Sequence, residues 1–182
     1  GCAGFIGFNY CLRELKKNKK IKVYGIDNIN NYYDIKLKKD RLKILSNHKN
    51  FKFYKYDLKN YKSINKLVSR NKIKIILHLA AQAGVRYSIY NPDVYFDSNL
   101  KGFFNILKIA QENSIKHFIF ASTSSVYGLK KKYPISEKEN SDKPLSFYAA
   151  TKKCNEVLAF SFSNIYKLPC TGLRFFTVYG PY

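Results

Sequence analysis

The sequence predicts an α/β domain built on a doubly wound, Rossmann-like parallel sheet. Short, nearly continuous apolar runs alternate with amphipathic helical segments along the chain. Such apolar runs are typical of parallel strands that helices cover on both faces. A glycine-rich loop opens the chain and leads directly into a helical segment. With 182 residues and 46% hydrophobic residues, the chain is long enough for one such domain.

Strands and helices are predicted in alternation. The predicted strands are rich in Ile, Val, Phe or Tyr, and the predicted helices carry apolar residues three or four positions apart. Pro92 suits the first turn of the central helix, and a polar loop at 128–143 precedes the last helix. The predicted order is helix 8–17, strand 21–26, helix 35–46, strand 51–56, helix 63–70, strand 73–79, helix 94–112, strand 117–121, helix 148–166 and strand 169–176.

Charge and cysteine usage argue against several classes of protein. The net charge is +21, but only five of the 33 basic residues are arginines and the lysines are dispersed, so we expect no specific nucleic-acid binding. There is no apolar run of about eighteen residues, so we expect no membrane span. The four cysteines and three histidines have no metal-ligand spacing, so we expect no bound metal. These features favour a cytoplasmic protein with reduced thiols.

A dinucleotide site is predicted at the start of the chain. Gly1, Gly4 and Gly7 form a G-x-x-G-x-x-G loop in which backbone amides can approach a pyrophosphate at a helix N-terminus. Asp27 follows Gly7 by twenty residues and ends the next strand, where a carboxylate accepts hydrogen bonds from the adenosine ribose. Because this carboxylate would repel a 2′-phosphate, the pattern favours NAD over NADP.

A catalytic pair is predicted at the start of the last helix. Tyr148 and Lys152 are four residues apart, so they share one helix face. A phenol has an unperturbed pKa of about 10, and a nearby ammonium would stabilise its phenolate. A hydroxyl from the stretch Ser122 to Ser125, which follows a predicted strand, could lie on the other side of the substrate oxygen. An ordinary helix pair is the alternative interpretation, and the dinucleotide signal favours catalysis.

The chain resembles the NAD-dependent epimerase/dehydratase family, a group of extended short-chain dehydrogenases/reductases. The matching motifs occur in the family's order along the whole chain. Three stretches, 27–34, 78–88 and 173–181, are most similar to those of UDP-glucuronate 4-epimerases. The motifs that carry the resemblance are Gly1-x-x-Gly4-x-x-Gly7, Asp27, Asp57-Leu58, Leu79-Ala80-Ala81-Gln82, Asn99, Ser122 to Gly128, Tyr148-x-x-x-Lys152 and Arg174-Phe175-Phe176-Thr177.

The resemblance implies C4 epimerisation of a UDP-hexuronic acid, from UDP-glucuronate to UDP-galacturonate, with tightly bound NAD. Tyr148 would remove the C4 hydroxyl proton, and the hydride would later return to the other face of a 4-keto sugar. Lys152 would hold the nicotinamide ribose and lower the pKa of Tyr148, while Thr123 would bind the reacting oxygen. The implied cofactor site is Gly1, Gly4, Phe5, Ile6, Gly7, Asp27, Asn28, Asp57, Leu58, Leu79, Ala80, Ala81, Gln82, Asn99, Tyr148 and Lys152, and the implied sugar site is Arg86, Ser124, Ser125 and Thr177.

Alternatives remain open at this stage. The substrate could be UDP-glucose or UDP-N-acetylglucosamine, and a dehydratase or decarboxylase is less favoured. Dehydratases of the family typically carry Asp-Glu where this chain has Ser124-Ser125, and decarboxylases typically carry Glu at the second of these positions. Asn99 could instead hold the sheet end through backbone bonds, and Arg86 could be solvated. A NADP-dependent reductase conflicts with Asp27, and a protein that only senses NAD would not need a base.

The resemblance also implies that the chain is an internal fragment. The family's first strand and its C-terminal substrate-binding lobe would lie outside it. That strand lies mid-sheet in the family order 3-2-1-4-5-6, so its absence would leave two unpaired edges, and we expect the isolated chain to be poorly soluble or inactive. We expect the full-length protein to form a homodimer through the helices at 94–112 and 148–166.

Overall fold

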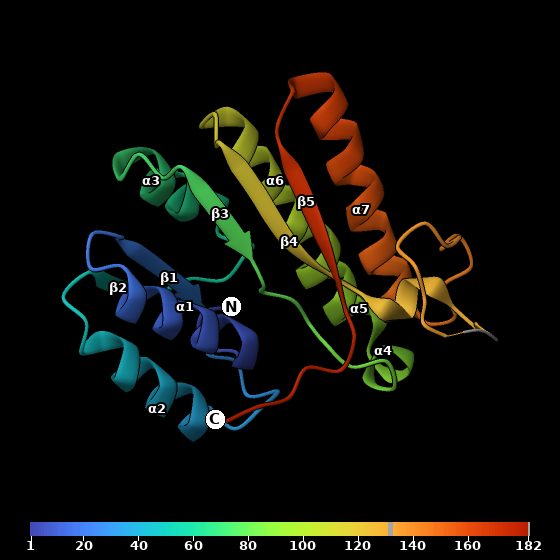
Figure 1. The fold of residues 1–182 in the computed structure, drawn as a ribbon, viewed down its shortest axis with the longest axis horizontal. Helices are drawn as coiled ribbons and strands as arrows, with labels where there is room; N and C mark the ends of the chain where they lie inside the picture. Colours follow the sequence, from blue (N-terminus) through green and yellow to red (C-terminus); the bar gives the residue numbers. More distant parts are fainter. Residues whose placement is uncertain (131–132, 182) are drawn as a thin grey trace.

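The structure is a computed structural model that describes residues 1–130 and 133–181. Helices and strands alternate along nearly the whole chain (Figure 1). The observed bounds differ from the predicted ones by at most three residues in every predicted strand and helix. The predicted polar loop at 128–143 is present, although residues 131 and 132 lie outside the described residues.

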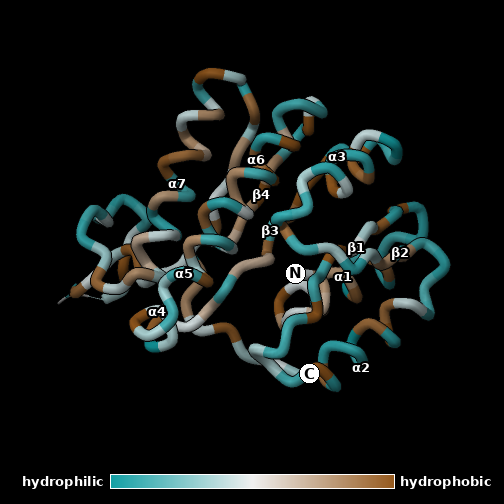
Figure 2. Tube along the Cα trace, turned by 180° about the vertical axis from the view of Figure 1, so that it is seen from behind, coloured by the Kyte–Doolittle hydropathy of each residue, from teal (hydrophilic) through white to brown (hydrophobic). Residues whose placement is uncertain are grey.

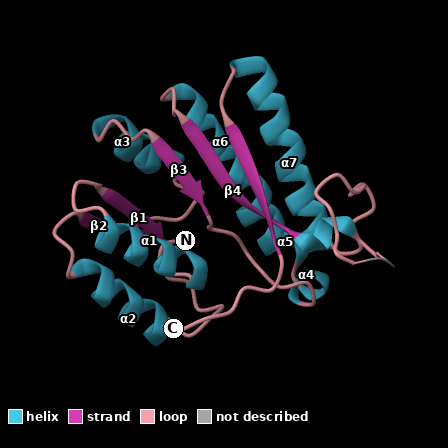
Figure 3. Cartoon of the chain, viewed as in Figure 1, coloured by secondary structure: helices cyan, strands magenta, loops and turns pink. Residues whose placement is uncertain are grey.

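All strands are parallel and form two neighbouring sheets (Figure 3). In one sheet, β1 (Val23–Asp27) pairs with β2 (Phe51–Lys55). In the other, β4 (His117–Thr123) lies between β3 (Ile75–His78) and β5 (Cys170–Phe175). The predicted parallel α/β architecture is confirmed.

The helices are divided between the two faces of the sheets (Figure 1). On one face, α1 (Phe5–Lys17) and α2 (Ile35–Ser46) pack their apolar residues against β1 and β2. On the other face, α3 (Tyr61–Arg70), α6 (Phe103–Glu112) and α7 (Phe147–Tyr166) enclose a second core with β4. Helices on both faces give the doubly wound arrangement that the apolar strands predict.

The second core is centred on aromatic rings. Phe103 of α6 lies 5.7 Å from Phe118 and 5.2 Å from Phe120 between ring centroids, and all three side chains are buried. His78, at the end of β3, lies 5.6 Å from Phe103. Burial lowers the pKa of His78 well below its usual value, so this histidine is a neutral core side chain at neutral pH.

The two sheets meet at the N-terminus of the chain. The amino group of Gly1 donates to the carbonyl of Ile26 in β1 at 2.6 Å. On the other side, a Cβ at Gly1 would lie 2.6 Å from the backbone nitrogen of Ala80, just after β3. Within the described residues β1 and β3 have no strand between them.

The central helix is less regular than predicted. It begins with α5 (Pro92–Tyr95), continues as a π-helical segment, η1 (Phe96–Gly102), and ends as α6. Two short helices were not predicted, α4 (Tyr87–Tyr90) and the 3₁₀ helix η2 (Ser124–Tyr127). π-Helical turns are frequent at functional sites. No helix in the described part of the chain is long and apolar enough to span a membrane.

Candidate active site

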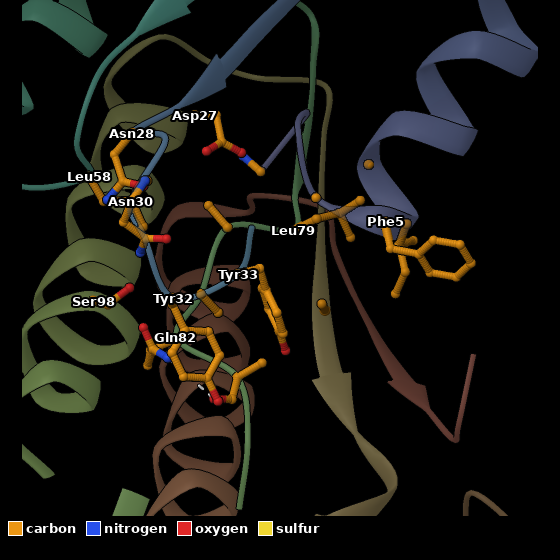
Figure 4. Close-up of a pocket in the computed structure, with 18 of the residues that line it drawn as sticks. Phe5, Asp27, Asn28, Asn30, Tyr32, Tyr33, Leu58, Leu79, Gln82 and Ser98 are labelled. Carbon is orange, nitrogen blue, oxygen red and sulfur yellow. Dashed lines mark hydrogen bonds and ion pairs between the residues drawn. The ribbon is translucent and has the colours of Figure 1, made fainter. Parts of the chain in front are cut away.

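A cavity of about 540 Å³ opens at the carboxyl ends of the strands, where the two sheets meet. Its walls come from the N-terminus of α1, the ends of β1, β3 and β4, and the first turns of α7. Figure 4 shows Asp27, Asn28 and Leu58 at one side of the cavity and Tyr32 and Gln82 at the other. Open parallel sheets bind ligands in such a crevice.

The glycine loop lines the cavity with backbone atoms. A residue with a side chain could not replace Gly1 or Gly7, because its Cβ would overlap neighbouring backbone. A Cβ at Gly7 would lie 2.1 Å from the carbonyl oxygen of Gly1. Gly4 caps α1 without a side-chain hydrogen bond, so the first backbone N–H groups of the helix can bind an anion. Together these features support the predicted pyrophosphate site.

Asp27 joins the glycine loop to β1. One of its carboxylate oxygens accepts a hydrogen bond from the backbone N–H of Ala3 at 3.1 Å, and the other accepts from Ile29 at 2.9 Å. The Gly1 amino group lies 3.8 Å from this carboxylate. Asp27 also lines the cavity. It therefore positions the loop as well as contributing an acceptor to the site.

The candidate catalytic residues line the same cavity as the glycine loop and Asp27. Lys152 is buried, and its ammonium donates to the carbonyl of Ala121 at 2.9 Å. Burial lowers the pKa of Lys152 to about 8. Thr123 and Tyr148 line the same cavity. A phenolate can take a proton from a substrate hydroxyl when a neighbouring hydroxyl and an ammonium stabilise its charge.

The pKa of Tyr148 differs from the sequence expectation. Burial raises this pKa above its usual value and outweighs the opposing effect of a hydrogen bond with Thr123. The sequence predicts that Lys152 lowers the pKa of Tyr148. In the structure the protein's own side chains do not produce that lowering. A positive charge from a bound ligand would act in the required direction.

The structure places Asn99 behind the cavity wall. Its side chain accepts a hydrogen bond from the Gln82 backbone N–H at 2.8 Å and donates to the Gln82 carbonyl at 3.0 Å. It also donates to Thr151 at 3.2 Å, and Thr151 donates to the carbonyl of Tyr148 at 2.7 Å. Asn99 thus joins the loop after β3 to the first turn of α7. This is the structural role considered above as the alternative to contact with the cofactor.

None of the four predicted sugar-binding residues, Arg86, Ser124, Ser125 and Thr177, is among the residues that line the cavity. Thr123 donates to the hydroxyl of Ser125 at 3.2 Å, and its own oxygen caps the backbone N–H of Ser125. Arg86 is exposed in the loop before α4. Ser88 follows it and accepts a hydrogen bond from the backbone N–H of Tyr148 at 3.2 Å. Roles for Arg86, Ser124, Ser125 and Thr177 toward a sugar stay predictions.

Sixteen of the sequence-predicted residues line the cavity together. Because strands and helix ends far apart in the sequence supply them, the fold brings the two predicted sites into one. The lining residues are Gly1, Gly4, Phe5, Ile6, Gly7, Asp27, Asn28, Asp57, Leu58, Leu79, Ala80, Ala81, Gln82, Thr123, Tyr148 and Lys152.

The cavity is also lined by residues that the sequence did not predict for the site, among them Asn30, Tyr32, Tyr33 and Lys38. Lys38 of α2 is buried and donates to both the carbonyl and the side chain of Asn30, at 2.9 and 2.6 Å. Burial lowers the pKa of Lys38, and Asp27 opposes this shift. Tyr32 and Tyr33 lie in the same loop (Figure 4). Asn30, Tyr32 and Tyr33 fall in the stretch 27–34 that carries the resemblance, whereas no sequence signal indicates Lys38.

The chain belongs to the family described as GDP-mannose 4,6 dehydratase, whose model matches residues 1–182. It is 50% identical over its whole length to Protein CapI of Staphylococcus aureus, and it covers 54% of that protein. It is 46% identical over 183 aligned residues to UDP-glucuronate 4-epimerase 6 of Arabidopsis thaliana, of which it covers 39%.

A solved structure has the same fold. The crystal structure of UDP-glucuronic acid 4-epimerase from Bacillus cereus, in complex with UDP-glucuronic acid and NAD, aligns with a TM-score of 0.91 and 35% identity. The alignment covers all of this chain and 56% of that one. The chain thus spans about half the length of several of the proteins it matches.

We predict that replacing Thr123 by Val raises the pKa of Tyr148 further. The replacement keeps the shape of the side chain but removes the hydrogen bond that lowers this pKa. NMR titration of ¹³C-labelled tyrosines, with the Tyr148→Phe variant for assignment, measures the shift. Ser136→Ala, in the loop before α7, is the control and should leave the pKa unchanged. An unchanged or lower pKa in Thr123→Val would contradict the prediction.

Proposed function

We propose that this chain is the cofactor-binding part of a UDP-glucuronate 4-epimerase that uses bound NAD. The observation that carries the proposal is a single cavity lined both by the glycine loop with Asp27 and by Thr123, Tyr148 and Lys152. Relatives named UDP-glucuronate 4-epimerase and a solved complex with UDP-glucuronic acid and NAD support it.

The residues of the cavity fit NAD. The glycine loop leaves no room for side chains where a pyrophosphate would approach the backbone, and Asp27 offers carboxylate oxygens toward the ribose end. NAD, when bound, supplies a hydride acceptor and donor. Tyr148 would take the proton of the C4 hydroxyl, Thr123 would hold the same oxygen, and Lys152 would keep positive charge beside the phenolate.

The sugar site favours epimerisation over loss of carbon dioxide. A glucuronate oxidised at C4 is a β-keto acid, which decarboxylates when its carboxylate aligns with the ketone. Ser124, Ser125 and Thr177 are neutral donors that could bind this carboxylate without repelling it. The hydroxyls of Thr123 and Ser125 lie 3.2 Å apart, so the group proposed to hold the reacting oxygen and a group proposed to hold the carboxylate would be neighbours.

The activity is tested with the full-length gene product, UDP-glucuronate and NAD. We expect UDP-galacturonate as the main product with little carbon dioxide release. Tyr148→Phe should lower turnover by about 10²–10⁴-fold, because general base catalysis contributes that much, while NAD stays bound. Chromatography of the sugar nucleotides and of protein-bound NAD measures both. Turnover of UDP-glucose but not UDP-glucuronate, or a UDP-pentose as main product, would refute the proposal.

Replacing Asp27 by Ala should weaken NAD binding and reduce the preference against NADP. Hydrogen bonds to charged groups contribute roughly 1.5–3 kcal/mol, so we expect the Kd for NAD to rise about 10- to 100-fold. Asp27→Asn separates the two effects, because its amide oxygen can still accept a hydrogen bond from the glycine loop after the charge is lost. Calorimetric titration with both dinucleotides measures this, and Asp40→Asn on the exposed side of α2 is the control. Equal affinities in wild type and Asp27→Ala would remove Asp27 from the site.

A second copy of the chain is the proposed partner of α6 and α7. Figure 2 shows hydrophobic and hydrophilic residues alternating along α7. The exposed apolar side chains of these two helices include Phe104, Val157 and Phe160, at 43, 57 and 71%. Burying such a patch would stabilise a homodimer. Phe160→Glu in the full-length protein should produce monomers in analytical ultracentrifugation, whereas Leu129→Glu should not. A dimer unaffected by Phe160→Glu would place the interface elsewhere.

The proposed location is the cytoplasm. All four cysteines are free, as is usual in reducing compartments. Cell fractionation tests this location, and recovery of the protein with secreted or membrane material would refute it.

A further inference from the structure

A third polar residue of α7 continues the spacing of the catalytic pair. Tyr148, Lys152 and Glu156 follow one another at intervals of four residues and so share a helix face. Lys152 contacts the carbonyl of Ala121, and one oxygen of Glu156 accepts from the hydroxyl of Ser122 at 2.6 Å. Successive turns of α7 are thus joined to successive residues of β4, immediately before Thr123.

Glu156 also binds β5, at the residue that pairs with Ser122. Arg174 of β5 lies beside Ser122 in the strand register. Its guanidinium donates to both carboxylate oxygens of Glu156, at 2.8 and 2.9 Å. Phe175 and Phe176, which follow Arg174, line the cavity. The Glu156 carboxylate therefore joins α7 to the C-terminal ends of β4 and β5. Each of these three elements carries or precedes residues that line the cavity.

The hydrogen bonds that Glu156 accepts from Arg174 and Ser122 are charge-assisted and largely buried. The side chain of Glu156 is 15% exposed and that of Arg174 is 21% exposed. Burial raises the pKa of Glu156, but hydrogen bonds from Arg174 and Ser122 outweigh it and lower the pKa overall. The guanidinium also lies 4.8 Å from the ring centroid of Tyr127, which anchors η2, the turn that carries Ser124 and Ser125.

We propose that Glu156 is a positioning residue that sets the distance between Tyr148 and Thr123 at the reacting oxygen. It does not line the cavity itself and acts through Ser122 and Arg174. The inference rests on the proposed function, because a positioning residue requires a reaction. A misplacement of about 1 Å at a reacting centre can lower a rate about 10²-fold.

Steady-state kinetics of the full-length protein test this role. Glu156→Gln keeps the shape but loses the charge, and we expect kcat to fall about 10- to 100-fold with KM and bound NAD changed less than threefold. Glu156→Asp restores the carboxylate and should give an intermediate kcat. Asp142→Asn is the matched control: it removes an exposed carboxylate 3.4 Å from Lys153, in the same region, and should leave kcat unchanged.

A double-mutant cycle separates positioning from general stabilisation. If Glu156 acts through Ser122, Ser122→Ala and Glu156→Gln together should lower kcat no more than the stronger single change. The proposal is overturned if Glu156→Gln keeps kcat within twofold, if Glu156→Asp gives no rescue, or if kcat, bound NAD and thermal stability fall in proportion. Wild-type protein inactive on UDP-glucuronate but active on another UDP-sugar would refute only the proposed substrate, and the same cycle is then measured on that sugar. Inactivity on every UDP-sugar would overturn both.

Discussion

The close approach of backbone segments at the junction of the two sheets is the constraint on which the rest of the site depends. Gly1 lies between the end of β1 and the backbone after β3, with no room for a Cβ, and Gly7 faces Gly1 equally closely. Asp27 holds this arrangement through the backbone of Ala3. Because this part of the cavity wall is made of backbone, its shape is set by the sheets and not by adaptable side chains.

Around Lys152 the cavity wall is held by side-chain hydrogen bonds, whereas the glycine loop is held by backbone packing. Lys152 and Glu156 join α7 to β4, Arg174 extends the connection to β5, and Asn99 joins α7 to the loop after β3. These contacts are polar and mostly buried, so losing one partner would leave the other unsatisfied at considerable cost. The surroundings of Lys152 thus depend on a few specific side chains, whereas the glycine loop depends on the main chain.

The sequence was sufficient for the fold class and for most of the cavity, because both follow from local pattern. Strand alternation, the glycine spacing and the Tyr148–Lys152 spacing are visible in short windows. The π-helical turn at Asn99 and the buried ammonium of Lys38 are not, because each depends on partners brought close only by the fold. In the sequence Glu156 has no feature that distinguishes it from an ordinary helix carboxylate, because its partners Ser122 and Arg174 are brought close only by the fold.

Burial acts on Tyr148 and Lys152 in the same direction, toward their neutral forms. It raises the pKa of the phenol and lowers that of the ammonium to about 8. Both shifts work against a phenolate beside an ammonium, so such a pair must be stabilised by mutual contact and by fixed dipoles around it. The carbonyl of Ala121 is one such dipole, since it accepts from Lys152 and favours its charged form. Its place depends on β4, and the position of β4 against α7 depends in turn on the contact between Ser122 and Glu156.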